Sequence, residues 1–223
     1  MYQLVQRLLK KGIIDKWFFI RYSDPKFHLR IRFHLTDKKY FSNLMEAIHK
    51  AFNPLMLSGE ISDLSKRTYK RELERYGNEN MENAEQLFYL NSNCITSLIQ
   101  VIHQQKGIRP EQKLFTIIFA VDQFLTDFGL DQQERLHFIQ QNRNMFAREF
   151  RLEQSKDLKS QIQNSYRAHK NHIFQLLSTS TVDEELVKGF DKIKSVIKLQ
   201  SKLLRLPIVS IKKVLAKHKE EIG

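Results

Sequence analysis

The spacing of hydrophobic residues changes along this chain, from helical to alternating and back to helical. Residues 2–11 place apolar side chains at helical spacing, and Gly12 is a typical helix stop; the apolar positions are Leu4, Val5, Leu8 and Leu9. Residues 17–22 (WFFIRY) predict a strand by their aromatic and β-branched content, and residues 27–35 predict a second by strict alternation. The intervening SDP at 23–25 is turn chemistry, so the two strands predict a hairpin.

The next stretch carries weaker signals. Residues 39–52 predict a helix that ends near Pro54, and residues 55–61 have extended character within an ambiguous stretch from 55 to 69. Residues 71–78 are polar and end in a Gly–Asn turn.

Helical periodicity governs the rest of the chain. It predicts helices over 82–102, 114–128, 132–150, 158–177 and 183–206, with Gly129 ending the second and Pro207 separating the last from a short basic tail helix. Strands followed by helices predict an α+β fold, in which a mostly antiparallel N-terminal sheet precedes a predominantly helical C-terminal half. Without a repeat or a low-complexity linker, residues 1–223 are expected to form a single domain.

The composition of the chain indicates the size of its core, its cellular compartment and the charge of its partners. The chain has 41% hydrophobic residues, 16 of them Phe, which suffices for a sizeable core. Its single cysteine, Cys94, excludes an internal disulfide, and no apolar run is long enough to span a membrane, so a cytoplasmic protein is expected. The net charge of +12 favours acidic partners such as nucleic acid, an anionic peptide or a carboxylate-bearing ligand, although a general lysine-rich surface explains the charge equally well.

Metal and nucleotide chemistry is not indicated. The chain has no GxGxxG, P-loop or HExxH pattern, Cys94 stands alone on an apolar helix face, and the pair His169 and His172 lacks a neighbouring acidic residue. Cys94 and the Phe-rich helix 114–128 are therefore interpreted as core. No metal and no cofactor are expected.

The stretch HLRIRFH, residues 28–34, carries a stronger signal. As a strand it directs His28, Arg30, Arg32 and His34 to one face and its apolar residues to the other. An ordinary half-exposed strand explains this pattern, but arginine at both central positions suits bidentate contact with carboxylates.

A second basic cluster follows in RTYKRELERYG. Its arginines, Arg67, Arg71 and Arg75, recur every four residues, and Glu72 and Glu74 lie among them and are placed to orient the guanidinium groups. The two clusters together predict a pocket for an anionic group.

These segments also carry a family resemblance. WFFIRYSDPKFHLRIRF followed by TYKRELERYGNENMENAEQLF resembles the C-terminal, glutamate-elimination domain of class I lantibiotic dehydratases, which also occurs as separate thiopeptide-type bacteriocin biosynthesis proteins. Asn78 stands where the family prefers a second glycine, and Asn91 where it prefers aspartate. Beyond residue 100 only the helical pattern is similar.

The resemblance implies a lyase in bacteriocin biosynthesis that eliminates glutamate from glutamylated Ser or Thr of a precursor peptide. A separate large dehydratase subunit would be the partner that first transfers glutamate from glutamyl-tRNA, so this chain would meet tRNA only indirectly. By resemblance Arg30, Arg32 and Arg75 are the catalytic arginines. We assign Arg21, His28 and Arg71 to substrate binding.

The family's C-terminal segment with its catalytic histidine has no match in LPIVSIKKVLAKHKEEIG, and the chain looks shortened at both ends. His28 and His34 share the arginine face, but ordinary structural roles are favoured for both, and His218 in the basic tail is expected to be solvated. The chain alone is therefore expected to bind glutamyl-peptide but to turn it over poorly.

Two alternatives stay open. One is a thiopeptide ring-forming cycloaddition enzyme, because such enzymes share this domain. The other is a non-catalytic module that binds an acidic peptide or RNA through the +12 charge.

Overall fold

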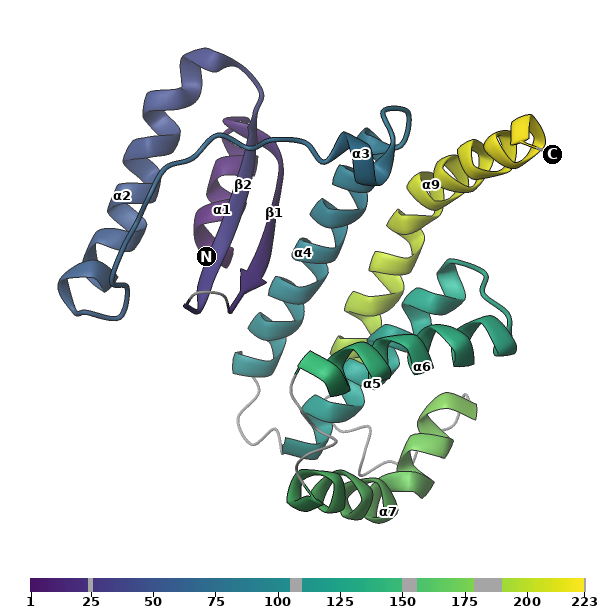
Figure 1. The fold of residues 1–223 in the computed structure, drawn as a ribbon. Helices are drawn as coiled ribbons and strands as arrows, with labels where there is room; N and C mark the ends of the chain where they lie inside the picture. Colours follow the sequence, from purple (N-terminus) through teal and green to yellow (C-terminus); the bar gives the residue numbers. More distant parts are fainter. Residues whose placement is uncertain (24–25, 105–109, 150–155, 179–189, 223) are drawn as a thin grey trace. The chain divides into compact units, whose positions relative to one another are not determined.

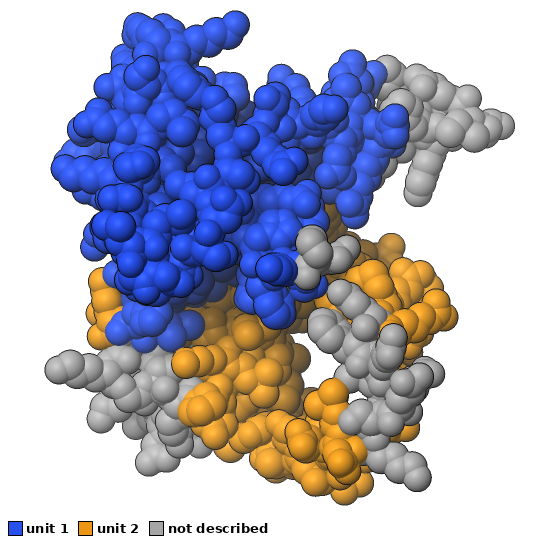
Figure 2. Space-filling view, turned by 60° about the vertical axis from the view of Figure 1, so that its left-hand side comes forward, with its two compact units in different colours: residues 1–103, 202–223 blue, residues 104–201 orange. Residues whose placement is uncertain are grey.

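The computed structural model describes residues 1–23, 26–104, 110–149, 156–178 and 190–222 (Figure 1). The chain divides into two compact units, which Figure 2 distinguishes by colour. Unit 1 comprises residues 1–103 and 202–223, and unit 2 comprises residues 104–201.

A two-stranded antiparallel hairpin organises unit 1. Strand β1 (Ile14–Tyr22) pairs with β2 (His28–Leu35), which confirms the predicted hairpin, although β1 begins three residues before the predicted strand. Asp24 and Pro25 of the predicted turn lie outside the described residues. The register has one irregularity, a bulge at Asp15, because Ile14 faces Leu35 while Lys16 faces His34.

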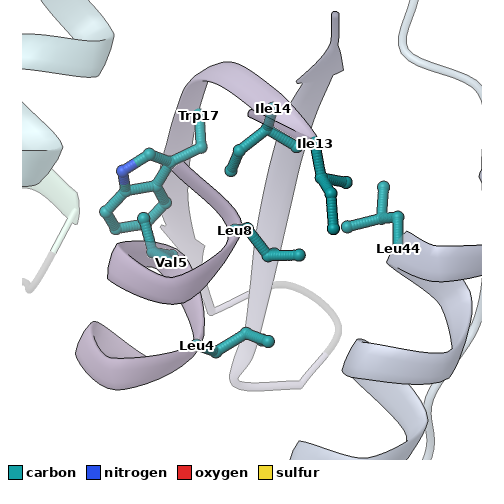
Figure 3. Close-up of a cluster of buried hydrophobic side chains, with 7 residues drawn as sticks. All are labelled: Leu4, Val5, Leu8, Ile13, Ile14, Trp17 and Leu44. Atoms are coloured by element: carbon teal, nitrogen blue, oxygen red, sulfur yellow. The ribbon is translucent and has the colours of Figure 1, made fainter. Parts of the chain in front are cut away.

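Helix α1 (Tyr2–Lys10) packs its apolar stripe on one face of this hairpin. Leu4, Val5 and Leu8 meet Ile13, Ile14 and Trp17 in a buried cluster, and Leu44 of α2 completes it (Figure 3). Gly12, with φ of 63°, provides the left-handed residue that ends α1 and turns the chain into β1. The predicted helix and its glycine stop are confirmed.

Helix α2 (Phe41–Leu57), preceded by the 3-10 turn η1 (Lys38–Tyr40), corrects the predicted end at Pro54. The helix continues through Pro54 to Leu57, and the chain then turns at Gly59, where φ is 77°. Since Pro54 lies in the last turn, its missing N–H removes a single helical hydrogen bond. The extended structure predicted for residues 55–61 is therefore wrong at 55–57.

Helix α4 (Met81–Gln104) follows the outer edge of β1 (Figure 1). Ser92 Oγ accepts the backbone N–H of Phe19 at 3.2 Å, and Asn93 Oδ1 accepts the indole N–H of Trp17 at 2.9 Å. The short helix α3 (Leu73–Tyr76) precedes α4 and ends at Gly77, where φ is 74°. Cys94 of α4 is buried, as its apolar helix face predicted.

Unit 2 contains α5 (Pro110–Asp127), α6 (Gln132–Glu149), α7 (Lys156–Ser178) and the first part of α9 (Phe190–Ile222). Phe115 of α5 is buried, and its ring contacts both His169 and His172 of α7 edge-on. An ion pair joins Arg135 to Asp122 at 3.3 Å.

Helix α9 corrects the predicted break at Pro207. It runs without interruption from Phe190 to Ile222, with Pro207 inside it; the predicted start at 183–189 lies outside the described residues. A proline inside a helix removes one hydrogen bond and bends the helix, and packing of the adjacent turns compensates. Leu204 and Ile208, on either side of Pro207, are both almost fully buried.

The fold class is α+β, as the order of strands and helices predicted. Among the described residues, no helix combines the length and the apolar content needed to cross a membrane. The single-domain assignment stays a prediction.

Candidate anion-binding site

The hairpin register determines which side chains share a face. His28, Arg30, Arg32 and His34 of β2 pair with Tyr22, Ile20, Phe18 and Lys16 of β1, and directly paired residues lie on the same side of a sheet. We call this side the arginine face. The apolar residues of β2 (Ile31, Phe33 and Leu35) pack against the cluster formed with α1, so the predicted alternation is confirmed.

Arg30 is held by two ring systems. Its guanidinium carbon lies 3.9 Å from the centre of the Tyr22 ring, and its Nε donates to His28 Nε2 at 3.2 Å. His28 Nδ1 in turn lies 2.8 Å from the Lys26 carbonyl oxygen, and its ring stacks on Tyr22 at 5.3 Å. Only the neutral tautomer that carries its proton on Nδ1 makes both bonds, so His28 acts here as a hydrogen-bond acceptor that orients Arg30.

Arg32 is half-buried and lies over a different ring. Its guanidinium carbon is 5.5 Å from the centre of the Tyr69 ring, and Nη1 donates weakly to the Ile31 carbonyl at 3.4 Å. Among the described residues, no carboxylate lies within ion-pair distance of Arg30 or Arg32. Both cations are thus oriented by aromatic rings and available to an external anion.

Tyr69 connects the arginine face to the second basic cluster. Burial, followed by the negative charge and hydrogen bond of Glu85, raises the pKa of Tyr69 to about 12. Glu85 also accepts a bidentate pair from Arg71, at 2.9 Å from Nε and 2.5 Å from Nη2. Arg71 is therefore already engaged by a carboxylate, and its predicted role in substrate binding would require it to share that partner.

Aromatic contacts continue from Tyr69 to Arg75. Phe18 contacts Tyr69 at 5.6 Å and Phe88 at 5.3 Å between ring centres, and Phe88 contacts Tyr76 at 5.4 Å. Arg75 lies 5.5 Å above the Tyr76 ring, and its Nη1 is 3.5 Å from Glu72. A continuous set of contacts thus links Arg32 to Arg75, although Arg75 itself is mostly exposed.

Arg21 does not share this face. It pairs with Leu29 in the register, on the side of the hairpin that faces the α1 cluster, so it reaches the arginine face only through the backbone of β1. At the other end of the arginine face, His34 Nδ1 lies 2.6 Å from Asp15 Oδ1, and both side chains are exposed.

Sequence reasoning missed the aromatic and acidic residues that organise the arginines. Tyr69 and Tyr76 lie within the same TYKRELERYG block as the arginines, which is a usable signal for pairing rings with guanidinium groups. Glu85 is 14 residues from Arg71, at a separation that no local pattern detects.

A groove lies elsewhere in unit 1, away from the arginine face. This groove, of about 420 Å³ between α1 and α2, is floored by apolar residues such as Leu4 and Leu8 and rimmed by charged ones such as Arg7 and Lys50. It includes none of the predicted site residues. The described residues also contain no group of three or more His, Cys, Asp or Glu side chains placed to hold a metal ion.

The part of the chain that the structure describes thus combines an α+β fold with a hairpin face whose ring-supported arginines have no carboxylate partner there, an arrangement that suits the binding of anionic groups. The chain belongs to the family of C-terminal domains of lantibiotic biosynthesis dehydratases: the family model, described as "Lantibiotic biosynthesis dehydratase C-term", matches residues 1–221. It is thus related to the enzymes of lantibiotic biosynthesis, as the resemblance in its hairpin implied.

Two curated relatives are similar to parts of the chain. The subtilin biosynthesis protein SpaB of Bacillus subtilis is 36% identical over 141 residues, which is 63% of this chain and 13% of the relative. The nisin biosynthesis protein NisB of Lactococcus lactis subsp. lactis is 25% identical over 188 residues, which is 81% of this chain and 17% of the relative. The chain therefore spans less than a fifth of either relative.

Among solved structures, the tRNA-dependent lantibiotic dehydratase MibB from Microbispora sp. 107891 is similar to 97% of this chain. The alignment covers 26% of that protein, with 18% sequence identity and a TM-score of 0.49. The family assignment does not depend on this comparison.

Proposed function

We propose that this protein binds precursor peptides carrying glutamylated Ser or Thr and eliminates glutamate to leave dehydroalanine or dehydrobutyrine. Membership of the lantibiotic dehydratase family supports a role in bacteriocin biosynthesis and peptide modification. The single observation that carries the finer proposal is the pair Arg30 and Arg32, which share one sheet face and have no carboxylate partner among the described residues.

The reaction requires three things of the site. A base removes the α-proton of the glutamylated residue, the electron pair forms the Cα=Cβ double bond, and the Cβ–O bond breaks so that glutamate leaves as a carboxylate. Negative charge develops on the peptide carbonyl during proton removal and on the departing ester oxygen afterwards. Arginines suit both positions because they remain protonated and bind oxyanions with two parallel N–H groups.

We assign Arg30 and Arg32 to the leaving glutamate and the developing charge, with Arg75 as the third catalytic arginine. His28 orients Arg30 through the Nε–Nε2 bond of 3.2 Å. The base remains unassigned.

Binding and turnover are best tested separately, because the sequence predicts that the two differ. Binding is measured with a fluorescent peptide in which an amide replaces the glutamyl ester, so that it cannot eliminate. Turnover is measured as loss of glutamate from the ester peptide by mass spectrometry. We expect both Arg30→Ala and Arg30→Lys to weaken binding severely, because lysine lacks the planar fork.

Arg7→Ala is the matched control, since Arg7 is an exposed arginine on α1 that contacts only its own helix at Gln3 in the described hydrogen bonds. Equal losses in Arg7→Ala and Arg30→Ala would show that general positive charge, rather than the arginine face, binds the peptide. Full binding by Arg30→Lys would exclude the bidentate contact. Arg21→Ala is expected to have the smaller effect of a residue behind the sheet.

The partner that supplies the glutamylated peptide is the second part of the proposal. The chain matches 13% and 17% of its curated relatives. The family resemblance implies a division of labour in which a larger dehydratase region adds glutamate before this domain removes it. Co-purification with that region, produced as a separate polypeptide, tests the association. The larger region would then use tRNA as the source of glutamate, and this chain would adhere to tRNA only through its general positive charge.

A further inference from the structure

The bulge in β1 places two successive side chains on the same face of the hairpin. Asp15 and Lys16 together oppose His34 of β2, because a bulge sets two residues of one strand against one residue of the other. Ile14 and Trp17, on either side of them, are both buried in the cluster with α1 (Figure 3). Asp15 and Lys16 therefore both lie on the arginine face, although successive residues of a regular strand point to opposite faces. The bulge thus adds a carboxylate to a row of basic side chains.

This carboxylate binds the histidine at the end of the row. Asp15 Oδ1 lies 2.6 Å from His34 Nδ1, and an ionised carboxylate can only accept a hydrogen bond, so His34 carries a proton on Nδ1 and donates it to Asp15. In the neutral ring the lone pair is then on Nε2. A histidine held in this way by a carboxylate has the tautomer that accepts a proton from a substrate.

A contribution to stability explains the Asp15–His34 pair poorly. Both side chains are exposed, and ion pairs between exposed side chains add little to folding stability. The bulge that brings Asp15 to this position interrupts the ladder of the hairpin. Bulges are frequent next to active sites, where they redirect a side chain, so the arrangement suits a chemical role.

The two histidines of the arginine face are used differently. His28 accepts Arg30 Nε at its own Nε2 at 3.2 Å, and its Nδ1 lies 2.8 Å from the Lys26 carbonyl oxygen. Both nitrogens of His28 are thus engaged, and its lone pair is occupied by Arg30. His34 has its carboxylate on Nδ1 and its lone pair on Nε2. The contacts therefore distinguish His34 from His28 as a proton acceptor.

We propose that His34 is the general base of the elimination and that Asp15 is the residue that positions it. This inference rests on the proposed function for the reaction, and it adds the base that the proposed function leaves unassigned. His34 follows Arg32 by two residues on the same face of β2, so their Cα atoms lie about 7 Å apart. The α-carbon of a glutamylated residue is two bonds from its ester oxygen, which allows one substrate to contact both side chains.

The proposed step balances without a further reactant. His34 Nε2 takes the α-proton, the electron pair of the C–H bond forms the Cα=Cβ double bond, and the Cβ–O bond breaks. Glutamate leaves as a carboxylate and needs no proton, so the imidazolium of His34 returns its proton to water. While the ring is charged, Asp15 stabilises it through the same hydrogen bond.

Proton removal can be measured apart from elimination. In the peptide that carries an amide in place of the glutamyl ester, the leaving group stays attached, but the α-proton can still be exchanged for deuterium from D2O. Mass spectrometry of the bound peptide measures this exchange. At saturating peptide, we expect His34→Ala to slow the exchange about 100-fold or more, because a positioned general base contributes on that order, and to change peptide affinity less than about twofold.

Three variants separate the base from a structural role. His34→Gln retains an N–H that can donate to Asp15 but cannot take a proton, so it should be as slow as His34→Ala. His49→Ala removes an exposed histidine of α2, outside the arginine face, and should exchange at the wild-type rate. Imidazole added to His34→Ala should restore part of the exchange, because it supplies the missing base in solution.

Asp15 is tested by a change that keeps its size. Asp15→Asn presents an amide N–H to His34 and no longer holds the proton on Nδ1. With the ester peptide, kcat should fall about tenfold or more while KM changes little, because the residue acts on the base and not on the bound peptide. An effect on KM alone would contradict this role for Asp15.

The outcome is distinguishable from failure of the proposed function. If exchange depends on His34 but no glutamate is released from the ester peptide, the base holds and the elimination activity does not. If glutamate is released equally by the wild type and His34→Ala, the activity holds and another group is the base. A wild-type chain that binds the amide peptide but neither exchanges its α-proton nor releases glutamate from the ester peptide would overturn both.

Discussion

At the scale of single residues, Glu85 serves two partners. It accepts both nitrogens of the Arg71 fork and the Tyr69 hydroxyl, and Tyr69 in turn lies beneath Arg32. Glu85, which no sequence pattern indicates, thus fixes the position of the Tyr69 ring below Arg32.

Replacing Glu85 should be visible in the titration of Tyr69. Glu85→Gln keeps the size of the side chain but removes the charge that disfavours the phenolate, so the pKa of Tyr69 should fall from about 12 toward its ordinary value of 10.0, with burial retaining part of the shift. Absorbance titration of the phenolate measures this, with Tyr69→Phe identifying the contribution of Tyr69. An unchanged tyrosine titration curve would show that Glu85 does not act on this ring.

Cys94 provides a pH-dependent stability test. Burial raises the pKa of its thiol to about 11 from 9.0. Below pH 9.0 the thiol is protonated in both the folded and unfolded states; between pH 9.0 and about 11 only the unfolded chain ionises, so folding stability falls as pH rises.

The expected loss in the free energy of unfolding is about 2–3 kcal/mol over that interval. Urea unfolding of the wild type and Cys94→Ala at about pH 8 and about pH 10.5 gives the comparison. The variant should be less stable at the lower pH because of the cavity, and should lose less stability on raising the pH. Parallel pH profiles for the two proteins would contradict the assignment.

At the scale of elements, the sequence predicted most of what local periodicity controls. The hairpin, α1 with its Gly12 stop and the long α4 all follow from hydrophobic spacing and turn chemistry. The two errors in helix length, at Pro54 and Pro207, have one cause: a proline costs a helix a single hydrogen bond, and whether the helix survives depends on tertiary packing.

The arginine face likewise combines features that local sequence determines with features that depend on tertiary packing. Alternation in β2 sufficed to place Arg30 and Arg32 together, because side-chain direction in a strand is local. Tyr69, which lies below Arg32, and Glu85, which binds Arg71, are brought to these arginines by tertiary contacts. Residue spacing in the sequence does not predict such contacts. The face of Arg21 follows from the pairing register, which sets it opposite Leu29, and its assignment to substrate binding stays a prediction.

Pro54 offers a direct test of helix α2. Pro54→Ala restores a backbone N–H near the end of a helix that already continues to Leu57, so it should raise the free energy of unfolding by about 1 kcal/mol, less than at a helix centre. Thermal unfolding measures the change. Asn53→Ala, at the adjacent position, controls for helix propensity alone, and an equal gain in both variants would remove the argument about the missing N–H.

At the scale of the whole molecule, the charge of +12 predicts adhesion to any polyanion. Binding to tRNA should weaken steeply as salt rises, because many phosphate contacts release counterions together, whereas binding of a glutamyl peptide should depend on salt only mildly. Filter binding with tRNA and fluorescence with the peptide, across the same salt series, separate the two modes.

The double variant Arg30→Ala, Arg32→Ala should abolish peptide binding and leave the tRNA salt slope nearly unchanged. If tRNA binding instead falls as far as peptide binding, the arginine face is a nucleic-acid site and the alternative reading as an RNA-binding module gains support.

The bulge at Asp15 predicts that deletion of this one residue is tolerated. Ile14 faces Leu35 and Lys16 faces His34, so removing the residue between them joins two partners that are already consecutive in the ladder. The in-frame loss of one codon would then leave Ile14 and Trp17 in the core and Lys16 outside, in contrast to most single-residue deletions in a strand, which reverse its faces. The deletion would remove the Asp15–His34 ion pair. Position 15 should therefore be the position in β1 where loss of one residue is best tolerated. A library of single-residue deletions along β1, with stability measured by thermal unfolding, tests this.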